Sequence, residues 1–516
     1  MNVLVPLPFA LPLFGAALAT LARRRGTWLR VLGPLVGAGV VAACAGLVAA
    51  VARDGVIAVQ MGGWAAPLGI TLVADRLSAL LLVVSATVLL AIMLHAVGEG
   101  AGGLSEHEPG VFYPAYLTLT GGVCLVFLAG DLFNLFVAFE VMLASSYVLM
   151  TLTPTGERVR AGMTYTVVSL TSSILFLTAL GLTYAATGTV NLADLSERTA
   201  GLPGTTRTAL ALLFLVVFGI KGAIVPMHLW LPDSYPAALT KITAVFAALL
   251  TKAAVYALIR VETLAFPREH GSWPMLVLAA GTIIIGTLGA LTHDDIHRVF
   301  SFILVGHIGY MLFGLALFDV AGLTGAILYL VHHIVVQATL FLVSDLMQGL
   351  TGETSLHRLG GLAGLSAFIA VLFFIPAMSV SGVPPTSGFV AKLALFQAGL
   401  GSGSTLAYAV TGVAVLGSVL TLMAMTRIWT LGFWRPRPRE ADEAAHARSA
   451  ERRARMAEPY TRGGVRLMQS VTAVMVAAGL LVAVFAGPLA SWSRSAASDL
   501  VDRTGYRHAV LDGGSP

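Results

Sequence analysis

The chain has 516 residues, of which 57% are hydrophobic and only 11% are charged, and its formal net charge is +5. Globular domains usually carry about 25% charged residues, so this chain cannot cover its surface with polar groups and requires lipid as solvent. That composition argues against a soluble enzyme, a nucleic-acid-binding protein and a secreted disulfide scaffold. The two cysteines, Cys44 and Cys124, lie in apolar runs and form no CxxC motif. We expect a multi-pass protein of the cell (plasma) membrane.

An apolar stretch of about 20 residues is needed to cross the hydrocarbon core as a helix. The sequence contains 14 such stretches, so the predicted fold is an all-α polytopic membrane protein with 14 transmembrane helices. They lie near residues 3–22, 31–52, 77–97, 112–130, 132–151, 164–186, 208–227, 242–260, 273–292, 299–317, 321–346, 366–386, 406–428 and 467–488. Because basic residues follow the first stretch rather than precede it, we expect a retained span and not a signal peptide.

The orientation follows from the 31 basic residues, which are 27 Arg and four Lys. An even number of helices places both termini on one side. With both termini extracytoplasmic, the inside loops hold 19 basic residues and the outside segments nine, as the positive-inside rule requires. Ten of the 19 lie between Arg427 and Arg466, where the polar tract 429–466 is expected to be a solvated cytoplasmic loop with a short helix. The Gly62–Trp64 stretch predicts an extracytoplasmic loop or hairpin.

Two predicted helices are interrupted by proline: the seventh, in KGAIVPMHLWLPDSYP (221–236), and the twelfth, in GVPP (382–385). Backbone groups freed by proline at membrane depth are tolerated only within protein or beside water. If helices 4–8 and 9–13 form two five-helix units, the broken helix is fourth in each, and the odd number inverts the second unit. Paired breaks of this kind point to an ion path. The expected divisions are 1–111 (helices 1–3), 112–260 (first unit), 273–428 (second unit), 429–466 (basic loop) and 467–516 (helix 14 and tail).

Several charged residues fall inside apolar stretches. Glu140 lies near mid-membrane, nine residues after Asp131, which is expected to cap its helix near a surface. An ionised carboxylate at that depth must be protonated, paired or hydrated. Glu140 therefore belongs either to a structural ion pair or to a pair with a Lys that is made and broken as protons move.

Three of the four lysines offer partners for such a carboxylate. Lys221 precedes the first break, Lys252 is about nine residues from either end of its span, and Lys392 follows the second break. Burial favours the neutral amine and a nearby carboxylate favours the ammonium, so these lysines can hold or release a proton. Snorkelling to the interface is the alternative, although Lys252 lies beyond comfortable reach. Lys241 is expected to lie in a loop as an ordinary cytoplasmic positive charge.

Histidines occupy the spans between these lysines. His332 and His333 are adjacent, His333 shares a helix face with Gln337 at i, i+4, and His307 lies in the tenth span. Satisfied core histidines are the alternative, but the adjacent pair favours a titrating relay.

Near the first break, His228 and Asp233 either gate the path or satisfy broken backbone. The sequence contains no nucleotide-binding motif and no His/Cys spacing for a metal, so we predict no cofactor and no metal site.

Six segments carry a resemblance to a known family: GDLFNLFVAFE (130–140), KGAIVPMHLWLPDSYP (221–236), LLTKAAVYALIR (249–260), DIHRVFSFILVGHIGYM (295–311), VHHIVVQATLFL (331–342) and GVPPTSGFVAKL (382–393). They resemble the proton-pumping antiporter-like subunits shared by respiratory complex I and the multisubunit Mrp Na+/H+ antiporters. The phrases WLPDSYP and VADRLSAL look most like the D-type branch of the Mrp subunits. The likeness runs from about Gly62 to Leu431.

The resemblance implies 14 helices, two inverted five-helix units and half-channels that meet in a central polar axis. It also implies that Glu140 and Lys221 pair in the first half-channel, that Lys252 is the central lysine, that His332 and His333 bridge, and that Lys392 is the distal lysine. Three sites depart from the family pattern. Gln337 stands where many relatives carry Lys, His297 replaces a common Lys at what is expected to be the surface, and Leu239 with Lys241 alters the stretch after WLPDSYP.

The leading hypothesis is an ion-transport subunit, not an enzyme, that relays protons in a multisubunit Na+/H+ antiporter. Its expected partners are other membrane subunits, protons, Na+ and membrane lipid, with no nucleic acid. One alternative is a proton-pumping subunit of a redox complex, such as NADH:quinone oxidoreductase or a membrane-bound hydrogenase. Another is a stand-alone solute transporter, which would need a substrate pocket.

Overall fold

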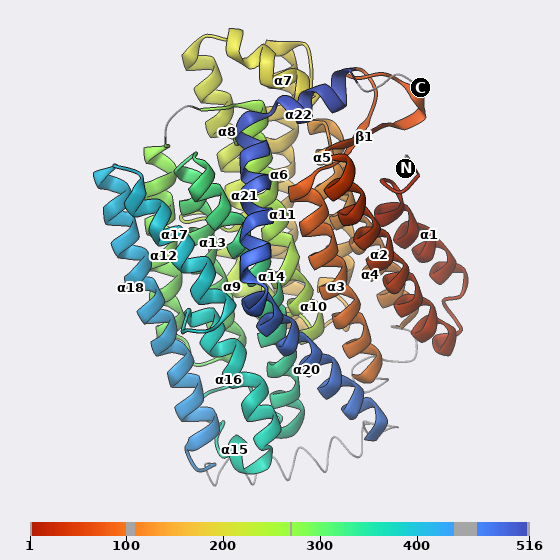
Figure 1. Ribbon diagram of the computed structural model, residues 1–516. Helices are drawn as coiled ribbons and strands as arrows, with labels where there is room; N and C mark the ends of the chain where they lie inside the picture. The colour runs from red at the N-terminus through yellow and green to blue at the C-terminus, as the bar shows by residue number, and fades with distance from the viewer. Residues whose placement is uncertain (1–2, 100–108, 269–270, 438–461, 513–516) are drawn as a thin grey trace.

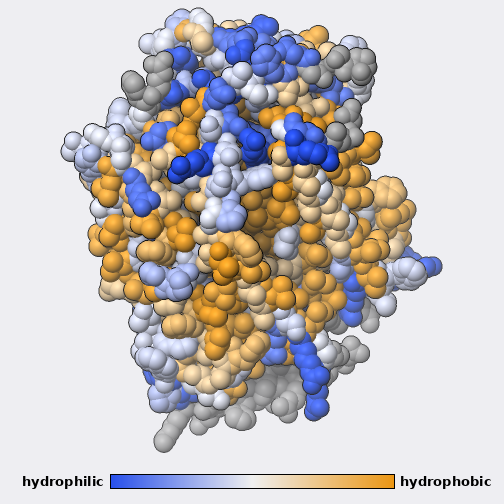
Figure 2. Space-filling view, viewed as in Figure 1, coloured by the Kyte–Doolittle hydropathy of each residue, from blue (hydrophilic) through white to orange (hydrophobic). Residues whose placement is uncertain are grey.

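The computed structural model describes residues 3–99, 109–268, 271–437 and 462–512. Long helices run side by side through it (Figure 1). On the face that Figure 2 shows, hydrophobic residues form a band across the middle, and hydrophilic residues gather toward the two ends. Within the described ranges, 12 helices are long and apolar enough to cross a membrane. The predicted spans 3–22 and 366–386 coincide with shorter apolar helices. The all-α polytopic fold is confirmed, whereas the count of 14 spans stays a prediction.

The N-terminal part contains three helices and a two-stranded hairpin. Its elements are α1 (Leu7–Leu21), α2 (Gly26–Asp54), β1 (Ile57–Gln60), the 3-10 helix η1 (Met61–Gly63), β2 (Thr71–Ala74) and α3 (Arg76–Glu99). The strands are antiparallel, with Ile57 opposite Ala74 and Gln60 opposite Thr71. The stretch at Gly62–Trp64 lies in the connection between them, so of the two predicted forms the hairpin is the correct one.

The segment that is expected to form the first five-helix unit follows. Its elements are α4 (Pro109–Leu128), α5 (Leu132–Met150), α6 (Gly156–Thr187), α7 (Leu192–Arg198), η3 (Thr199–Gly201), α8 (Gly204–Gly222), α9 (Trp230–Ser234), η4 (Tyr235–Ala237), α10 (Thr240–Val245), the π-helix η5 (Phe246–Leu250), α11 (Thr251–Arg260) and the π-helix η6 (Val261–Ala265). The first predicted break is confirmed: α8 ends at Gly222, Ala223 adopts a left-handed conformation, and helix resumes only at Trp230.

The segment that is expected to form the second unit has a similar succession of helices. Its elements are α12 (Trp273–Thr292), α13 (Ile296–Ala316), α14 (Val320–Thr351), α15 (Leu362–Leu365), α16 (Ala367–Ser381), α17 (Ser387–Gly401), α18 (Thr405–Ile428) and the π-helix η7 (Trp429–Trp434). Gly382, with φ +86°, ends α16, and α17 begins at Ser387, so the second break is also confirmed.

A pair of matched turns relates the two units. Asp131 forms a β-bridge with Asn191, and Asp295 forms a β-bridge with Ser355. Asp295 lies 164 residues after Asp131, and Ser355 lies 164 residues after Asn191. Both aspartates cap the helix that follows, and the helices between the bridged residues, α6 and α14, each have 32 residues. The first turn adjoins α7 and the second adjoins α15, which lie at opposite ends of the bundle (Figure 1). An inverted repeat would produce this correspondence.

The C-terminal part differs from the prediction. It consists of α20 (Arg462–Val484), α21 (Ala486–Asp502), α22 (Thr504–Arg507) and the π-helix η8 (His508–Asp512). The expected tail after residue 488 is helical because α21 buries Ala496, Ala497 and Leu500 against the bundle. The ends of the expected 429–466 loop are helical too, since η7 continues α18 and α20 begins at Arg462; the predicted short helix within 438–461 lies outside the described residues.

Candidate functional site

Glu140 of α5 and Lys221 of α8 meet through a third residue. The hydroxyl of Ser173, on α6, donates to Glu140 Oε1, and Lys221 Nζ donates to Ser173 Oγ at 3.1 Å. Lys221 is 7% exposed, and its ammonium lies 5.3 Å from the centre of the Phe139 ring. The predicted acid and base are therefore joined by a hydroxyl. Ser173 was missed in the sequence, where the only signal is a Ser-Ser pair inside an apolar run.

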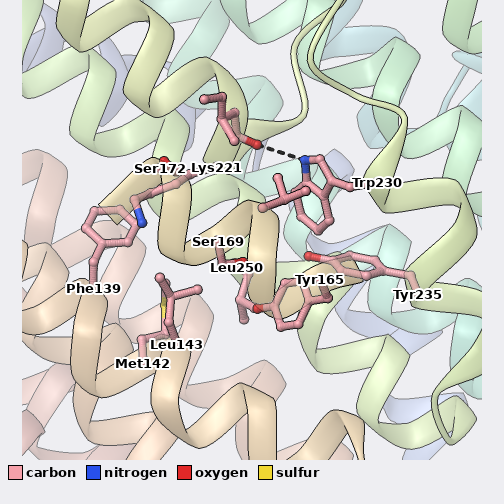
Figure 3. Close-up of a pocket in the computed structure, with 12 residues that line it drawn as sticks. Phe139, Met142, Leu143, Tyr165, Ser169, Ser172, Lys221, Trp230, Tyr235 and Leu250 are labelled. Atoms are coloured by element: carbon pink, nitrogen blue, oxygen red, sulfur yellow. Dashed lines mark hydrogen bonds between the residues drawn. The ribbon is translucent and has the colours of Figure 1, made fainter. Parts of the chain in front are cut away.

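A small cavity adjoins Lys221 (Figure 3). Tyr165, Trp230 and Tyr235 form one wall, and Leu250 belongs to the lining. About 20 Å³ is open to the centre of a water molecule, which is room for about one water. The helix break shapes this wall, because Trp230 Nε1 donates to the carbonyl of Ile220, near the end of α8, at 3.0 Å. The cavity thus extends from Lys221 toward the helix that carries Lys252.

Lys252 is completely buried on α11, directly after the π-helical segment η5. A π-helix shifts the hydrogen-bond ladder by one residue and often marks a functional site. Here the ammonium of Lys252 donates to the carbonyl of Ala247, within η5. The segment Thr240–Ala265 is wholly buried across its most apolar window. Snorkelling requires a side chain on the outer surface of the bundle, and Lys252 is enclosed, so its ammonium does not reach the membrane interface in this way.

The histidines form the centre of the second unit. The Nδ1 atom of His307, on α13, is hydrogen-bonded to the hydroxyl of Tyr329 at 3.0 Å. The centre of the His307 ring lies 5.1 Å from the centre of the His333 ring. His332 Nδ1 lies 2.9 Å from Ser387 Oγ, at the start of α17. Within the described part of the chain, neither ring nitrogen of His333 has a hydrogen-bond partner. An imidazole with two open nitrogens is suited to exchange protons through water.

Lys392 lies on the far side of the second break. Its ammonium donates to the carbonyls of Val380 and Ser381 at 3.1 and 3.0 Å, and lies 4.9 Å from the Tyr310 ring centre. These carbonyls end α16, where the helix dipole favours a cation. Lys392 and Lys252 both act electrostatically on His333 and His307, so the central groups form one coupled set.

The secondary candidates lie in different surroundings. Asp131 caps α5 by accepting from the Asn134 backbone N–H at 2.6 Å, as predicted, and burial raises the pKa of its carboxyl to about 6. Gln337 donates to the carbonyl of Phe300 at 3.1 Å. The structure does not bring His228 and Asp233 into one gate: His228 is buried in the break, whereas the Asp233 side chain is 71% exposed and pairs with Arg298 at 3.3 Å.

Two expectations are wrong. Lys241 is not a loop residue: it is buried in the first turn of α10 and its ammonium lies 2.6 Å from Glu99 Oε2 on α3. His297 is not at the surface: it is buried on α13, with its Nε2 3.2 Å from Ser344 Oγ. Both residues lie next to helix starts in the sequence, and only the packing of α14 against α3, α10 and α13 encloses them.

Fold and site together define the class of protein. A bundle of membrane-spanning helices that encloses interacting carboxylates, amines and imidazoles beside two helix breaks is typical of a polytopic ion-translocating membrane protein. In the residues described, no group of three His, Cys, Asp or Glu side chains is placed to hold a metal ion.

Comparison with known proteins identifies the family. Residues 129–421 match the family described as NADH:quinone oxidoreductase/Mrp antiporter, TM, and the chain belongs to this family, within its D-type Mrp branch. It is 35% identical over 514 residues to the D-type subunit of the Na(+)/H(+) antiporter of Alkalihalophilus pseudofirmus, covering 99% of this chain and 100% of that one. It is 36% identical over 441 residues to the protein of the same name from Bacillus subtilis, covering 84% of this chain and 87% of that one.

Solved structures agree in fold. A chain in the structure of the Mrp complex from Dietzia sp. DQ12-45-1b superposes with a TM-score of 0.88 at 34% identity, with 99% of both chains covered. A chain of the archaeal membrane-bound sulfane sulfur reductase superposes with a TM-score of 0.85 at 24% identity, over 99% of this chain and 100% of that one, which shows the fold alone. The resemblance inferred from the sequence is confirmed.

Proposed function

We propose that this chain is the proton-translocating subunit of a multisubunit Na+/H+ antiporter. The bridge from Glu140 through Ser173 to Lys221 carries the proposal, because it joins an acid to a base by a group that can pass a proton both ways. The proposed relay continues through Lys252 and the pair His332 and His333 to Lys392. High-coverage relatives named as D-type subunits of Na(+)/H(+) antiporters support the cation/proton exchange.

Other membrane subunits are the proposed partners. The structural neighbour at 34% identity comes from a multisubunit Mrp complex, which supports assembly in the cell membrane. In the proposed orientation both termini are extracytoplasmic, and the end of the bundle that carries α15 faces the cytoplasm, as the positive-inside rule favours.

The test is Glu140→Ala and, separately, Lys221→Ala in the complete complex. Each removes one end of the Ser173 bridge, so we expect antiport in membrane vesicles, followed with a pH-gradient dye, to be abolished while the complex still assembles. Glu157→Ala, at an exposed carboxylate in the first turn of α6, is the matched control and should retain wild-type activity.

Full antiport in either relay variant contradicts the proposal. Copurifying Fe–S subunits or quinone-dependent pumping would instead establish a redox complex. Solute transport by the purified chain alone would establish an independent transporter.

A further inference from the structure

A second set of ionisable side chains lies outside the proposed relay. We call it the α3–α14 cluster; it consists of His95, Glu99, Lys241, His297 and Asp345. His95 Nε2 lies 3.0 Å from Asp345 Oδ2, and Lys241 Nζ lies 2.6 Å from Glu99 Oε2. Asp345 also acts electrostatically on Lys241 and His297, so the two pairs and the imidazole form one electrostatic unit.

The α3–α14 cluster reaches water at one end of the bundle. Glu99 and Asp345 are 10% and 15% exposed at their side chains, whereas His95 and Lys241 are 0% and 1% exposed. Glu99 ends α3 and Lys241 is in the first turn of α10. These helix ends lie toward the end of the bundle that carries α15 (Figure 1).

The other side of the cluster faces the centre of the molecule. His297 Nε2 lies 3.2 Å from Ser344 Oγ, and Ser344 is two helical turns from Gln337 on the same face of α14. Phe341 lies between them, with its ring 5.9 Å from His297 and 5.5 Å from Phe300. Gln337 in turn donates to the carbonyl of Phe300 at 3.1 Å. Phe341 therefore lies on α14 between the residue that contacts the cluster, Ser344, and Gln337, which is one helical turn after His333.

We propose that the α3–α14 cluster is a proton-exchange site that connects water at this end of the bundle with the central relay. The inference rests on the proposed antiport function and supplies it with an aqueous connection. A proton from water binds the His95 imidazole or the Asp345 carboxylate, moves to His297, and leaves toward Gln337 and His333 once Phe341 admits water. No proton is consumed, and the reverse path releases it.

The composition of the cluster suits this role. Two acid–base pairs with an added imidazole can accept one more proton without leaving an unpaired buried charge. The neighbouring helices add a third carboxylate, Asp295, which caps α13 and acts electrostatically on His297. Thr472 of α20 lies 3.4 Å from His95 Nδ1, Phe112 of α4 lies 5.6 Å from Lys241 Nζ, and the arginines of α20 are Arg462 and Arg466, exposed near its start.

Two substitutions in the complete complex test the proposal. His95→Gln keeps a donor for Asp345 but cannot take up a proton, and we expect antiport in vesicles to fall by about tenfold or more. Asp345→Asn removes the negative charge that favours a protonated imidazole, and we expect the pH of half-maximal antiport to move down by about one unit. A merely structural pair predicts neither change, because Gln and Asn preserve the hydrogen bond.

Asp194→Asn is the matched control, since it removes a carboxylate paired with Arg198 at the opposite end of the bundle. It should retain the wild-type rate and pH profile. Wild-type rate and profile in both cluster variants, with Glu140→Ala inactive, overturn this inference and leave the proposed function standing. If Asp345→Asn does not assemble, His95→Gln alone decides. A wild-type complex without antiport overturns both proposals.

Discussion

Ser173 joins the carboxylate of Glu140 to the ammonium of Lys221, so the first part of the proposed relay depends on a neutral side chain. A search for buried charges passes over serine, because one hydroxyl in an apolar helix usually bonds to its own backbone. The adjacent Ser172 also reaches another helix, but it donates to a backbone carbonyl, that of Val217 on α8, at 3.0 Å, and not to a charged side chain. The pair offers a comparison at almost the same position.

We predict that Ser173→Ala lowers the rate of antiport by about tenfold, because a hydrogen bond to a charged group contributes about 1.5–3 kcal/mol. Ser172→Ala should leave the rate near that of the wild type. Both variants are measured in vesicles at matched expression levels. Equal rates in the two variants would show that Glu140 and Lys221 exchange protons without the Ser173 hydroxyl.

At the scale of elements, the two helix breaks place lysines differently. Lys221 belongs to the helix before the first break, whereas Lys392 belongs to the helix after the second and reaches back to the carbonyls that end α16. Gly382 suits the second break for two reasons. Its φ is +86°, which glycine adopts without strain, and the side chain of Lys392 passes directly beside it. A Cβ at residue 382 would lie 2.7 Å from Lys392 Cδ.

We predict that Gly382→Ala displaces Lys392 and reduces the rate of antiport by about tenfold. The left-handed backbone at residue 382 should also lower the stability of the variant by about 1–2 kcal/mol. Gly403→Ala is the control, because Gly403 also has a positive φ, +69°, but has no atom within 4 Å of the added Cβ. Transport rate and thermal stability are measured for both. Loss of stability in both variants with equal transport would contradict a role for the Gly382 contact.

At the scale of the whole molecule, one buried ion pair connects distant parts of the chain. Arg260, at the end of α11, donates to both oxygens of Asp75 at 2.6 and 2.5 Å, between the hairpin and α3. Arg260 also donates to Tyr256 OH at 2.9 Å and lies 5.6 Å from the ring of Tyr506 in α22. Burial alone would raise the pKa of Asp75, but Arg260 holds it below its usual value.

We predict that Asp75→Asn destabilises the protein by about 3–5 kcal/mol, because it leaves Arg260 buried without a counter-charge. Since the folded-state pKa of Asp75 is lowered, the stabilisation is present at neutral pH and is lost as the pH falls through that pKa. Thermal unfolding in detergent measures both effects. The exposed pair of Asp54 with Arg53 provides the control, and Asp54→Asn should leave the unfolding temperature close to that of the wild type, because water screens this pair. A similarly small change for Asp75→Asn would contradict this role.

Much of the architecture was predictable because the signals are local. Hydrophobic length gives the spans, proline gives the two breaks, and Asp131 at a helix start predicts its cap. The residue pairs that cross between helices were not predictable. The sequence predicts a loop at Lys241, because this residue lies just after the WLPDSYP break region, and nothing in its neighbourhood points to Glu99, 142 residues away.

Composition and local pattern indicate the lipid environment of this protein, the position of its breaks and the burial of Lys221, Lys252 and Lys392, since a charge inside a long apolar run must be enclosed wherever the helices pack. The packing of the helices settles which groups meet. It placed Ser173 between Glu140 and Lys221, and it brought Lys241 and His297 into the α3–α14 cluster. The reason is physical: burial follows from composition, whereas contact depends on the rotation and register of helices that are far apart in the chain.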